Sequence, residues 1–153
     1  MSVECGYDSS KDTLEHIQKV SQLLNKMVLE LMCRMQSHDA SKLRSPEKEI
    51  FDAYTPKLKG STYGSEEYKT FLSEMNVALE HHYSFNHHHP EHYEEGIGGM
   101  DLIDLVEMIC DWKAATTRHA NGDIDKSILI NKDRFGIPDQ LVRILQNTVK
   151  RYF

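Results

Sequence analysis

The stretch DLIDLVEMICDWKAAT, residues 101–116, decides the fold class of this 153-residue chain. Its apolar residues recur every three or four positions, which is the spacing of one face of an α-helix, and Asp101 precedes them as a helix cap. The residues expected to face the core are Leu102, Leu105, Ile109, Trp112 and Thr116. A second stripe beside this face contains Asp111 and therefore places that carboxylate at the edge of the core. Its members are Asp104, Met108, Asp111, Ala115 and Arg118.

The same helical spacing recurs along most of the chain, and we see no clear alternation of the kind that marks a strand. Helices are predicted to start near Asp12 or Thr13, at Ser45-Pro46-Glu47 and at Ser65, since hydroxyl or acidic caps stand there. The first is expected to turn near Asn25, the second to end near Tyr54, and the third to carry the stripe Tyr68, Leu72, Met75, Leu79 and His82. The ranges 55–64 and 86–99 hold the glycines and prolines typical of loops.

Three further features complete the predicted architecture. Asn121-Gly122 is expected to end the helix that Asp101 caps, and a shorter helix is expected from about Ile124 to Asp133. Gly136 and Pro138 separate it from a final helix with the stripe Leu141, Ile144, Leu145, Val149 and Tyr152. We therefore predict an all-α single domain of six or seven helices over residues 13–153, preceded by a tail at 1–12.

Composition excludes several function classes. With 24 acidic against 18 basic residues and a net charge of −6, an extended nucleic acid is not an expected partner. No apolar run approaches the ~20 residues that span a bilayer, so no membrane is expected either. The three cysteines are odd in number and widely spaced, which argues against disulfides or a zinc ribbon and fits a reducing compartment. Without a secretory signal, a cytoplasmic location is expected.

Histidine is the unusual component, because six of the nine histidines lie between positions 81 and 92. Histidine and aspartate bind transition metals when different helices bring them together. Elsewhere the chain offers His16 on the apolar stripe of the first helix, the pair His38-Asp39, and Asp111. Within the crowded segment, His82 is favoured over His81 because it continues the Leu72–Leu79 stripe, whereas His81 points about 100° away. The following loop has no periodicity; His88 is favoured and His89 comes next among His87, His88, His89 and His92.

A geometric condition applies to His16. It lies 22 residues before His38, and one unbroken helix would separate the two by about 33 Å. They can share an ion only if the chain turns between them. A continuous helix over 13–37 would remove His16 from the site.

Taken in order, these residues resemble the HD-domain superfamily of metal-dependent phosphohydrolases over about residues 13–120. HDASKL, residues 38–43, resembles the HD-x-x-K form of the family, with Lys42 at the lysine position. EHHYSFNHHHPEHY, residues 80–93, is similar to the extra histidine segment of two-metal members, and ICDWKAATTRH, residues 109–119, to the late aspartate helix. Within the superfamily, the chain resembles a small HD-like group of bacteria and phages.

The resemblance implies an HD-type helical bundle that binds one or two ions of manganese, iron, cobalt, nickel or zinc. The implied ligands are His16, His38, Asp39 and Asp111, with His82 and His88 at a second ion and Asp39 as the bridge. Lys42 stands where it could meet a phosphate oxygen and Glu47 where it could transfer a proton; both are assigned to catalysis with Asp39. The residues assigned to the substrate are Lys42, Arg118, His89 and His92.

The resemblance implies hydrolysis of a nucleotide or another small phosphate ester by a metal-activated water. It also makes a homodimer a possible assembly, because HD proteins are often dimers. Two alternatives stay open. Some HD proteins are di-iron oxygenases, and a helical protein with this pattern can also bind a metal or ligand without catalysis.

Overall fold

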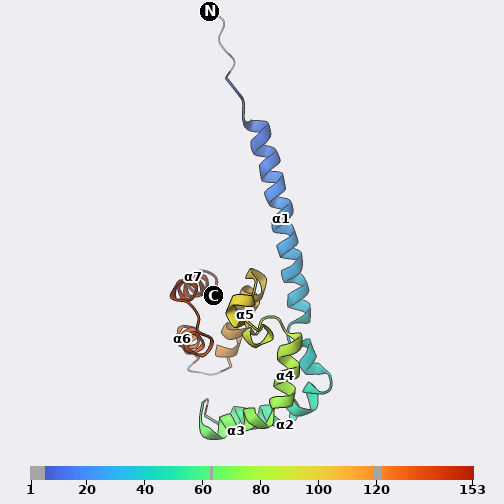
Figure 1. Cartoon of the computed structure of the whole chain (residues 1–153), viewed down its shortest axis with the longest axis vertical. Helices are drawn as coiled ribbons and strands as arrows, with labels where there is room; N and C mark the ends of the chain where they lie inside the picture. The colour runs from blue at the N-terminus through green and yellow to red at the C-terminus, as the bar shows by residue number, and fades with distance from the viewer. Residues whose placement is uncertain (1–5, 63, 119–121) are drawn as a thin grey trace, which may run out of the picture. The chain divides into compact units, whose positions relative to one another are not determined.

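The structure is a computed structural model that describes residues 6–62, 64–118 and 122–153. Over these residues it contains seven α-helices, three short 3₁₀ turns and no strand (Figure 1). The α-helices are α1 (Ser10–Ser37), α2 (Glu47–Gly60), α3 (Glu66–Glu74), α4 (Asn76–Phe85), α5 (Leu102–Thr116), α6 (Ile124–Phe135) and α7 (Asp139–Tyr152). The 3₁₀ turns are η1 (Ala40–Leu43), η2 (Pro90–His92) and η3 (Gly96–Gly99). The predicted all-α class is confirmed.

The chain divides into two compact units, residues 1–36 and residues 37–153. The helix of the first unit is α1, and the second unit holds all the other elements. None of the helices that the structure describes combines the length and apolar character that crossing a bilayer requires.

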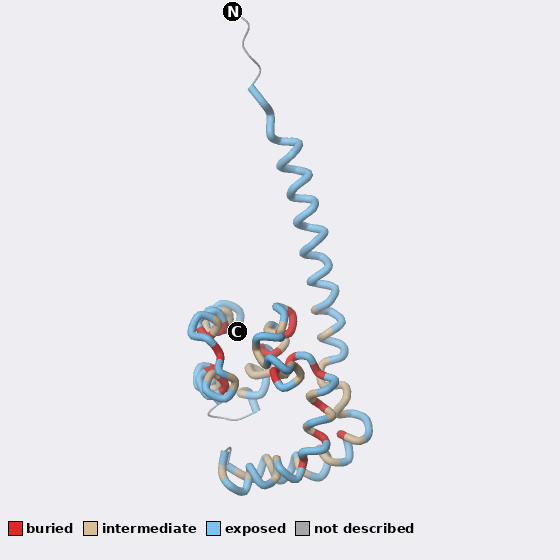
Figure 2. The backbone as a smooth tube through the Cα atoms, in the orientation of Figure 1, coloured by how far each residue is buried: buried red, intermediate tan, exposed pale blue. Residues whose placement is uncertain are grey.

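Helix α1 runs for 28 residues without a break, so the turn expected near Asn25 is wrong. It starts at Ser10, slightly before the predicted start. The range 10–37 contains neither glycine nor proline and is rich in leucine, lysine, glutamine and methionine, which favour the helix interior. No residue of α1 is buried, and the tube in Figure 2 is pale blue along almost all of it.

Helix α2 begins at Glu47, one residue later than the start expected at Pro46 with Ser45 as its cap. Pro46 itself holds the cap position and makes no side-chain hydrogen bond. The helix continues past Pro56 to Gly60, so the predicted end near Tyr54 is wrong. The Lys57 ammonium lies 4.2 Å from the centre of the Tyr54 ring. This cation–π contact joins the residues on either side of Pro56 and helps to hold the last turn together.

Ser65 caps α3 as predicted, because its side chain accepts a hydrogen bond from the backbone N–H of Tyr68. The single helix expected from Ser65 to His82 is divided at Met75, where the backbone leaves helical geometry and α4 begins. The Met75 side chain is fully buried at this junction. The predicted stripe nevertheless keeps its direction in α4, since His82 is buried on the same side.

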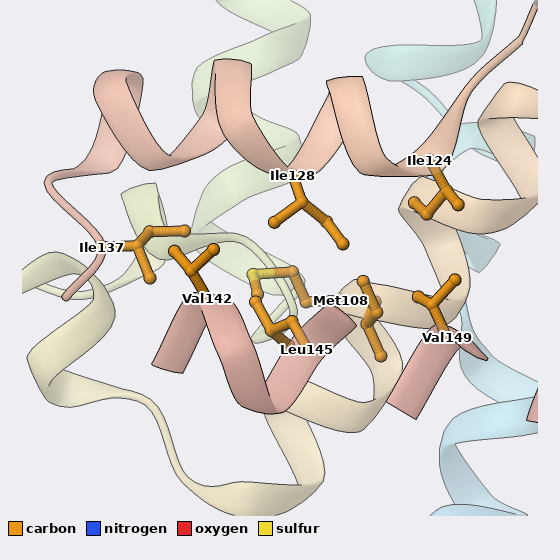
Figure 3. Close-up of a cluster of buried hydrophobic side chains, with 8 residues drawn as sticks. Met108, Ile124, Ile128, Ile137, Val142, Leu145 and Val149 are labelled. Atoms are coloured by element: carbon orange, nitrogen blue, oxygen red, sulfur yellow. The ribbon is translucent and has the colours of Figure 1, made fainter. Parts of the chain in front are cut away.

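The hydrophobic core of the second unit lies between α5, α6 and α7. Figure 3 shows Met108, Ile128 and Leu145 pointing toward one another from these three helices. Asp101 caps α5 in a capping box with Asp104, as the sequence indicated for Asp101. The remaining buried members of the cluster are Ile109, Ile124, Ile137, Val142 and Val149.

The buried side of α5 is rotated from the predicted one. Leu102 is exposed, whereas Asp104 is buried. The Tyr93 hydroxyl donates to Oδ2 of Asp104 at 2.5 Å, and the backbone N–H of Asp101 donates to the same oxygen. A buried carboxylate needs such partners. Thr116 is only partly buried at the end of the helix.

The last two helices follow the prediction in outline. Gly136 ends α6 in the left-handed conformation, with φ of 62°, and α6 itself runs two residues past Asp133. In α7 the buried line is Val142, Leu145 and Val149, so Ile144 and Tyr152, which were expected to face the core, are exposed. The end of α5 is at Thr116, and the expected terminator Asn121 lies outside the described residues.

Candidate metal centre

Seven histidine, aspartate and glutamate side chains of the second unit come together from four parts of the chain. One pair follows α1 directly, one histidine comes from α4, two come from the loop after it, and two acids come from α5. They form three overlapping sets in which all ligand atoms lie within 4.8 Å of one another. The sets are Asp39, His82, His88 and His89; His38, His88 and Glu107; and His38, Asp39 and Asp111.

Asp39 is central to this arrangement. Its φ is 55°, a left-handed conformation that aspartate tolerates better than most residues. The carboxylate thereby faces two groups of partners. Its Oδ1 lies 3.2 Å from Nε2 of His82 and 3.6 Å from Nε2 of His88, while its Oδ2 lies 2.7 Å from the Lys42 ammonium.

The first set is dense in nitrogen. Nε2 of His82 lies 3.0 Å from Nε2 of His89, and both residues belong to one set with Asp39. Atoms that bind one ion at the usual metal–ligand distance of ~2.1 Å stand about 3.0–3.4 Å apart when they are neighbours. The spacing of these side chains therefore fits a shared cation.

His88 adds a second indication. It is 1% exposed, and neither ring nitrogen makes a hydrogen bond to any residue that the structure describes. Oδ1 of Asp39 is likewise buried and makes no hydrogen bond to any described residue. Buried polar atoms are rarely left in this condition, and a bound cation is one way to satisfy them.

The other two sets share His38. Its Nε2 lies 3.7 Å from Oδ1 of Asp111 and 3.7 Å from Oδ2 of Asp39. Its Nδ1 lies 2.8 Å from Oε1 of Glu107. The same glutamate oxygen lies 3.1 Å from Nδ1 of His88, so Glu107 contacts two of the histidines at once.

Glu107 was not among the predicted site residues. A signal for it is present in the sequence, because Glu107 precedes Asp111 by four residues and therefore lies on the same face of α5. The prediction followed only the aspartate of this face.

The electrostatics keep Asp39 and Asp111 charged and one histidine neutral. The nearby carboxylates of Asp111 and Glu107 raise the pKa of His38 to about 10 in spite of its partial burial. Burial opposes ionisation of Asp39, but contact with His82 and the charges of Lys42 and His38 hold its pKa well below the usual range. Burial, with a smaller electrostatic contribution from the neighbouring imidazoles, lowers the pKa of His89 to about 3. An uncharged imidazole among ionised carboxylates is the state that metal binding requires.

Most of the predicted ligands are thus brought together: His38, Asp39, His82, His88 and Asp111. His89, assigned to the substrate, lies among them. His16 does not. It belongs to the unbroken α1, whose length between His16 and the helix end is about 30 Å, so it cannot share an ion with His38 of the same chain.

The other predicted residues have different surroundings. Glu47 is fully buried and contacts His81 and His82 rather than open space. His92 contacts the backbone oxygen of Tyr83 through Nδ1 at 2.8 Å and is not a member of the three sets. Arg118 lies exposed beyond the end of α5, and the neighbouring His119 lies outside the described residues.

Fold and site together define an all-α protein with a candidate metal centre made of four histidines and three carboxylates. The chain belongs to DUF5662, a family of unknown function, whose model matches residues 5–151. No curated protein matches the chain, and no solved structure does.

Proposed function

We propose that the chain is a metal-dependent phosphohydrolase of the HD type that acts on a nucleotide or another small phosphate ester. The observation that carries the proposal is the meeting of His38, Asp39 and Asp111 in one ligand set. A histidine-aspartate pair and a late helical aspartate are the residues on which the resemblance to HD enzymes depends.

The donor set supports a divalent transition metal. Imidazole nitrogens suit zinc, iron, nickel and copper, whereas carboxylate oxygens also suit manganese. The buried atoms of Asp39 and His88 that make no hydrogen bonds favour a cation over a purely structural polar cluster. A divalent ion at such a site supplies hydroxide at neutral pH by lowering the pKa of a bound water.

The two oxygens of Asp39 support a bridging role between two ions. Oδ1 faces His82 and His88, and Oδ2 faces His38 on the other side. The proposal covers one or two ions, because the three sets overlap in these residues.

Lys42 supports the choice of a phosphate substrate. Its ammonium lies 2.7 Å from Oδ2 of Asp39, and a third of its side chain is exposed. This cation at the edge of the centre can hold a phosphate oxygen while the aspartate contacts the ion. A small anionic substrate is compatible with the net charge of −6, since only a local positive site is needed.

A di-iron oxygenase is the second candidate, and the abundance of nitrogen donors favours it. Four histidines meet at the centre, and imidazole is a good iron ligand. Such a protein would be coloured when loaded with iron and would consume oxygen with its substrate.

The test begins with metal analysis of protein purified without added metal. Phosphate release from a panel of nucleotides is then measured with manganese, cobalt, nickel, zinc or iron, together with oxygen uptake. We expect metal-dependent phosphate release that Asp39→Asn abolishes, because asparagine keeps the left-handed backbone but loses the charge. Asp52→Asn, at an exposed carboxylate paired with Lys48, is the matched control and retains activity.

Three results would contradict the hydrolase. Oxygen uptake without phosphate release would favour the oxygenase. Metal binding with neither activity would favour a non-catalytic binding protein, and equal activity in Asp39→Asn would place the chemistry elsewhere.

A further inference from the structure

The side chain of Glu47 is the most deeply buried carboxylate near the metal centre, and it contacts none of the other acids there. It stands at the start of α2 with no exposed surface. An ionised carboxylate in this position needs several donors to offset its lost hydration. The structure provides three.

Two of these donors are histidines on adjacent positions of α4. Nδ1 of His81 lies 2.7 Å from Oε1 of Glu47, and Nδ1 of His82 lies 2.9 Å from Oε2. The third donor is the Ser41 hydroxyl, 3.0 Å from Oε2. Both carboxylate oxygens are therefore engaged.

Asn86 completes this network on the Nδ1 side of His82. Its side-chain amide donates to the backbone oxygen of His82 at 2.8 Å and to the Ser41 hydroxyl at 2.9 Å. Because that hydroxyl receives the Asn86 proton, its own proton is directed to Glu47. The Asn86 amide and the Ser41 hydroxyl also lie 3.1 Å from Nδ1 of His82. Because both Asn86 protons and the Ser41 proton are used in the bonds above, that nitrogen is left to donate to Glu47, and the His82 ring is held from its Nδ1 side.

The consequence concerns the other nitrogen of His82. A neutral imidazole carries one proton, so a proton held at Nδ1 leaves a lone pair at Nε2. That Nε2 atom is the one that lies 3.2 Å from Asp39 and 3.0 Å from His89. Metal-binding histidines commonly donate their second N–H to a carboxylate in this way, which fixes the tautomer and the ring orientation.

We propose that Glu47 is a positioning residue, which accepts the Nδ1 protons of His81 and His82 and thereby directs Nε2 of His82 to the metal ion. The inference rests on the proposed function. It replaces direct proton transfer as the role of Glu47, because the carboxylate is buried behind His82 and has no open side toward a substrate.

The first test reads the tautomers directly in the unaltered chain. Long-range ¹H–¹⁵N NMR spectra of protein with ¹⁵N-labelled histidine are recorded at mildly alkaline pH, without metal and with Zn²⁺. We expect His82 to carry its proton on Nδ1 in both states, and His81 likewise. A proton on Nε2 of His82 in either state would overturn the inference.

The second test measures Zn²⁺ affinity by competition with a chromophoric chelator. Glu47→Leu removes both acceptors at similar volume, and we expect it to weaken Zn²⁺ binding about 10- to 100-fold. Glu47→Gln keeps one acceptor oxygen for His82 and is expected to rescue most of the affinity. Glu49→Leu, at an exposed acid of the same helix, is the matched control and leaves affinity unchanged.

The outcomes separate this inference from the proposed function. A folded Glu47→Leu protein with the affinity of the original chain would overturn the positioning role. If Glu47→Leu does not fold, the ¹H–¹⁵N spectrum of Glu47→Gln decides. Loss of the Nδ1 proton from His81 with retention of the Nδ1 proton at His82 supports the inference. An unchanged tautomer of His81 contradicts it. A chain that binds no Zn²⁺ but shows the expected tautomers would refute the metal function. The hydrogen bonds from His81 and His82 to Glu47 would still be supported.

Discussion

At the scale of single residues, Asp39 shows how a weak sequence signal becomes a site. A His-Asp dipeptide is common, but here it follows the end of α1 directly and Asp39 adopts a left-handed conformation. This turn directs the carboxylate toward the histidines of α4 and the following loop. The sequence shows the dipeptide, whereas the turn becomes visible only in the structure.

Periodicity predicted some site residues and not others. His82 could be chosen over His81 because helical spacing from Leu79 continued to it, and His82 is buried as expected. No such rule applied to the loop, where His88 and His89 both joined the centre. Helical spacing also places Glu107 on the same face as Asp111, four residues later. It was not predicted as a site residue because an acid on a helix is usually solvated.

Metal binding at His38 should release a proton, which gives the centre a defined pH dependence. The pKa of His38 is raised to about 10 by Asp111 and Glu107, so the ring is charged at neutral pH and an ion must displace a proton from it. We expect affinity for Zn²⁺ to rise as pH rises toward that pKa, by about tenfold per pH unit for each proton released. Calorimetric titrations in buffers of different ionisation enthalpy measure this release.

The control for this prediction is His38→Gln, which keeps a polar side chain but has no titrating ring. Its remaining affinity should depend less steeply on pH than that of the unaltered chain. Equal slopes for the two proteins would show that His38 does not bind the ion.

Gly136 provides a residue-scale test of the fold that is independent of the metal. It ends α6 with φ of 62°, a conformation that a Cβ disfavours, although open space surrounds the position. We expect Gly136→Ala to lower the free energy of unfolding by about 1 kcal/mol, measured by urea denaturation. Gly60→Ala, at the end of α2 in equally open space and without a positive φ, should be neutral or slightly stabilising.

At the scale of elements, helix types were predictable and helix ends were less so. The starts of helices were predicted correctly where a side chain caps the helix, as at Ser65 and Asp101. Stop signals failed at Pro56, because helical geometry persists to Gly60, and the division at Met75 has no local marker in the sequence. The turn was expected inside α1 only because His16 and His38 could not share an ion without it. No glycine or proline there favoured a turn.

Helix α1 carries an apolar stripe that is exposed along its length. Ile17, Leu24 and Val28 are among its members, each about half exposed. Most of the stability of helices in proteins comes from packing of an apolar face rather than from helix propensity alone. We expect a synthetic peptide of residues 10–37 to gain helicity as its concentration rises, measured by circular dichroism.

A variant peptide with Leu24→Gln and Val28→Gln has comparable helix-forming residues but an interrupted stripe, and it should remain equally helical at all concentrations. Concentration-independent helicity of the unaltered peptide would show that the stripe does not promote self-association.

At the scale of the whole molecule, the second unit combines a core and a centre that use different parts of the same helix. Met108 and Ile109 of α5 face α6 and α7, whereas Glu107 and Asp111 face the histidines. Hydrophobic burial thus fixes the position of the helix that carries two of the carboxylates. The sequence predicted this division in part, since the two stripes of α5 are adjacent in its helical pattern.

Because the ligands come from the turn after α1, from α4, from the loop after it and from α5, a bound ion would join elements far apart in the chain. A ligand that binds only the folded state stabilises it by about 2.7 kcal/mol at a hundredfold excess over its dissociation constant. For a chain of this size that corresponds to an increase of roughly 5–10 °C in melting temperature. We expect Zn²⁺, Mn²⁺ or Co²⁺ to raise the Tm in thermal scans and a chelator to reverse the change. Asp39→Asn should lose the shift and Asp52→Asn should keep it, whereas a Tm that none of these ions moves would contradict a metal centre that joins these elements.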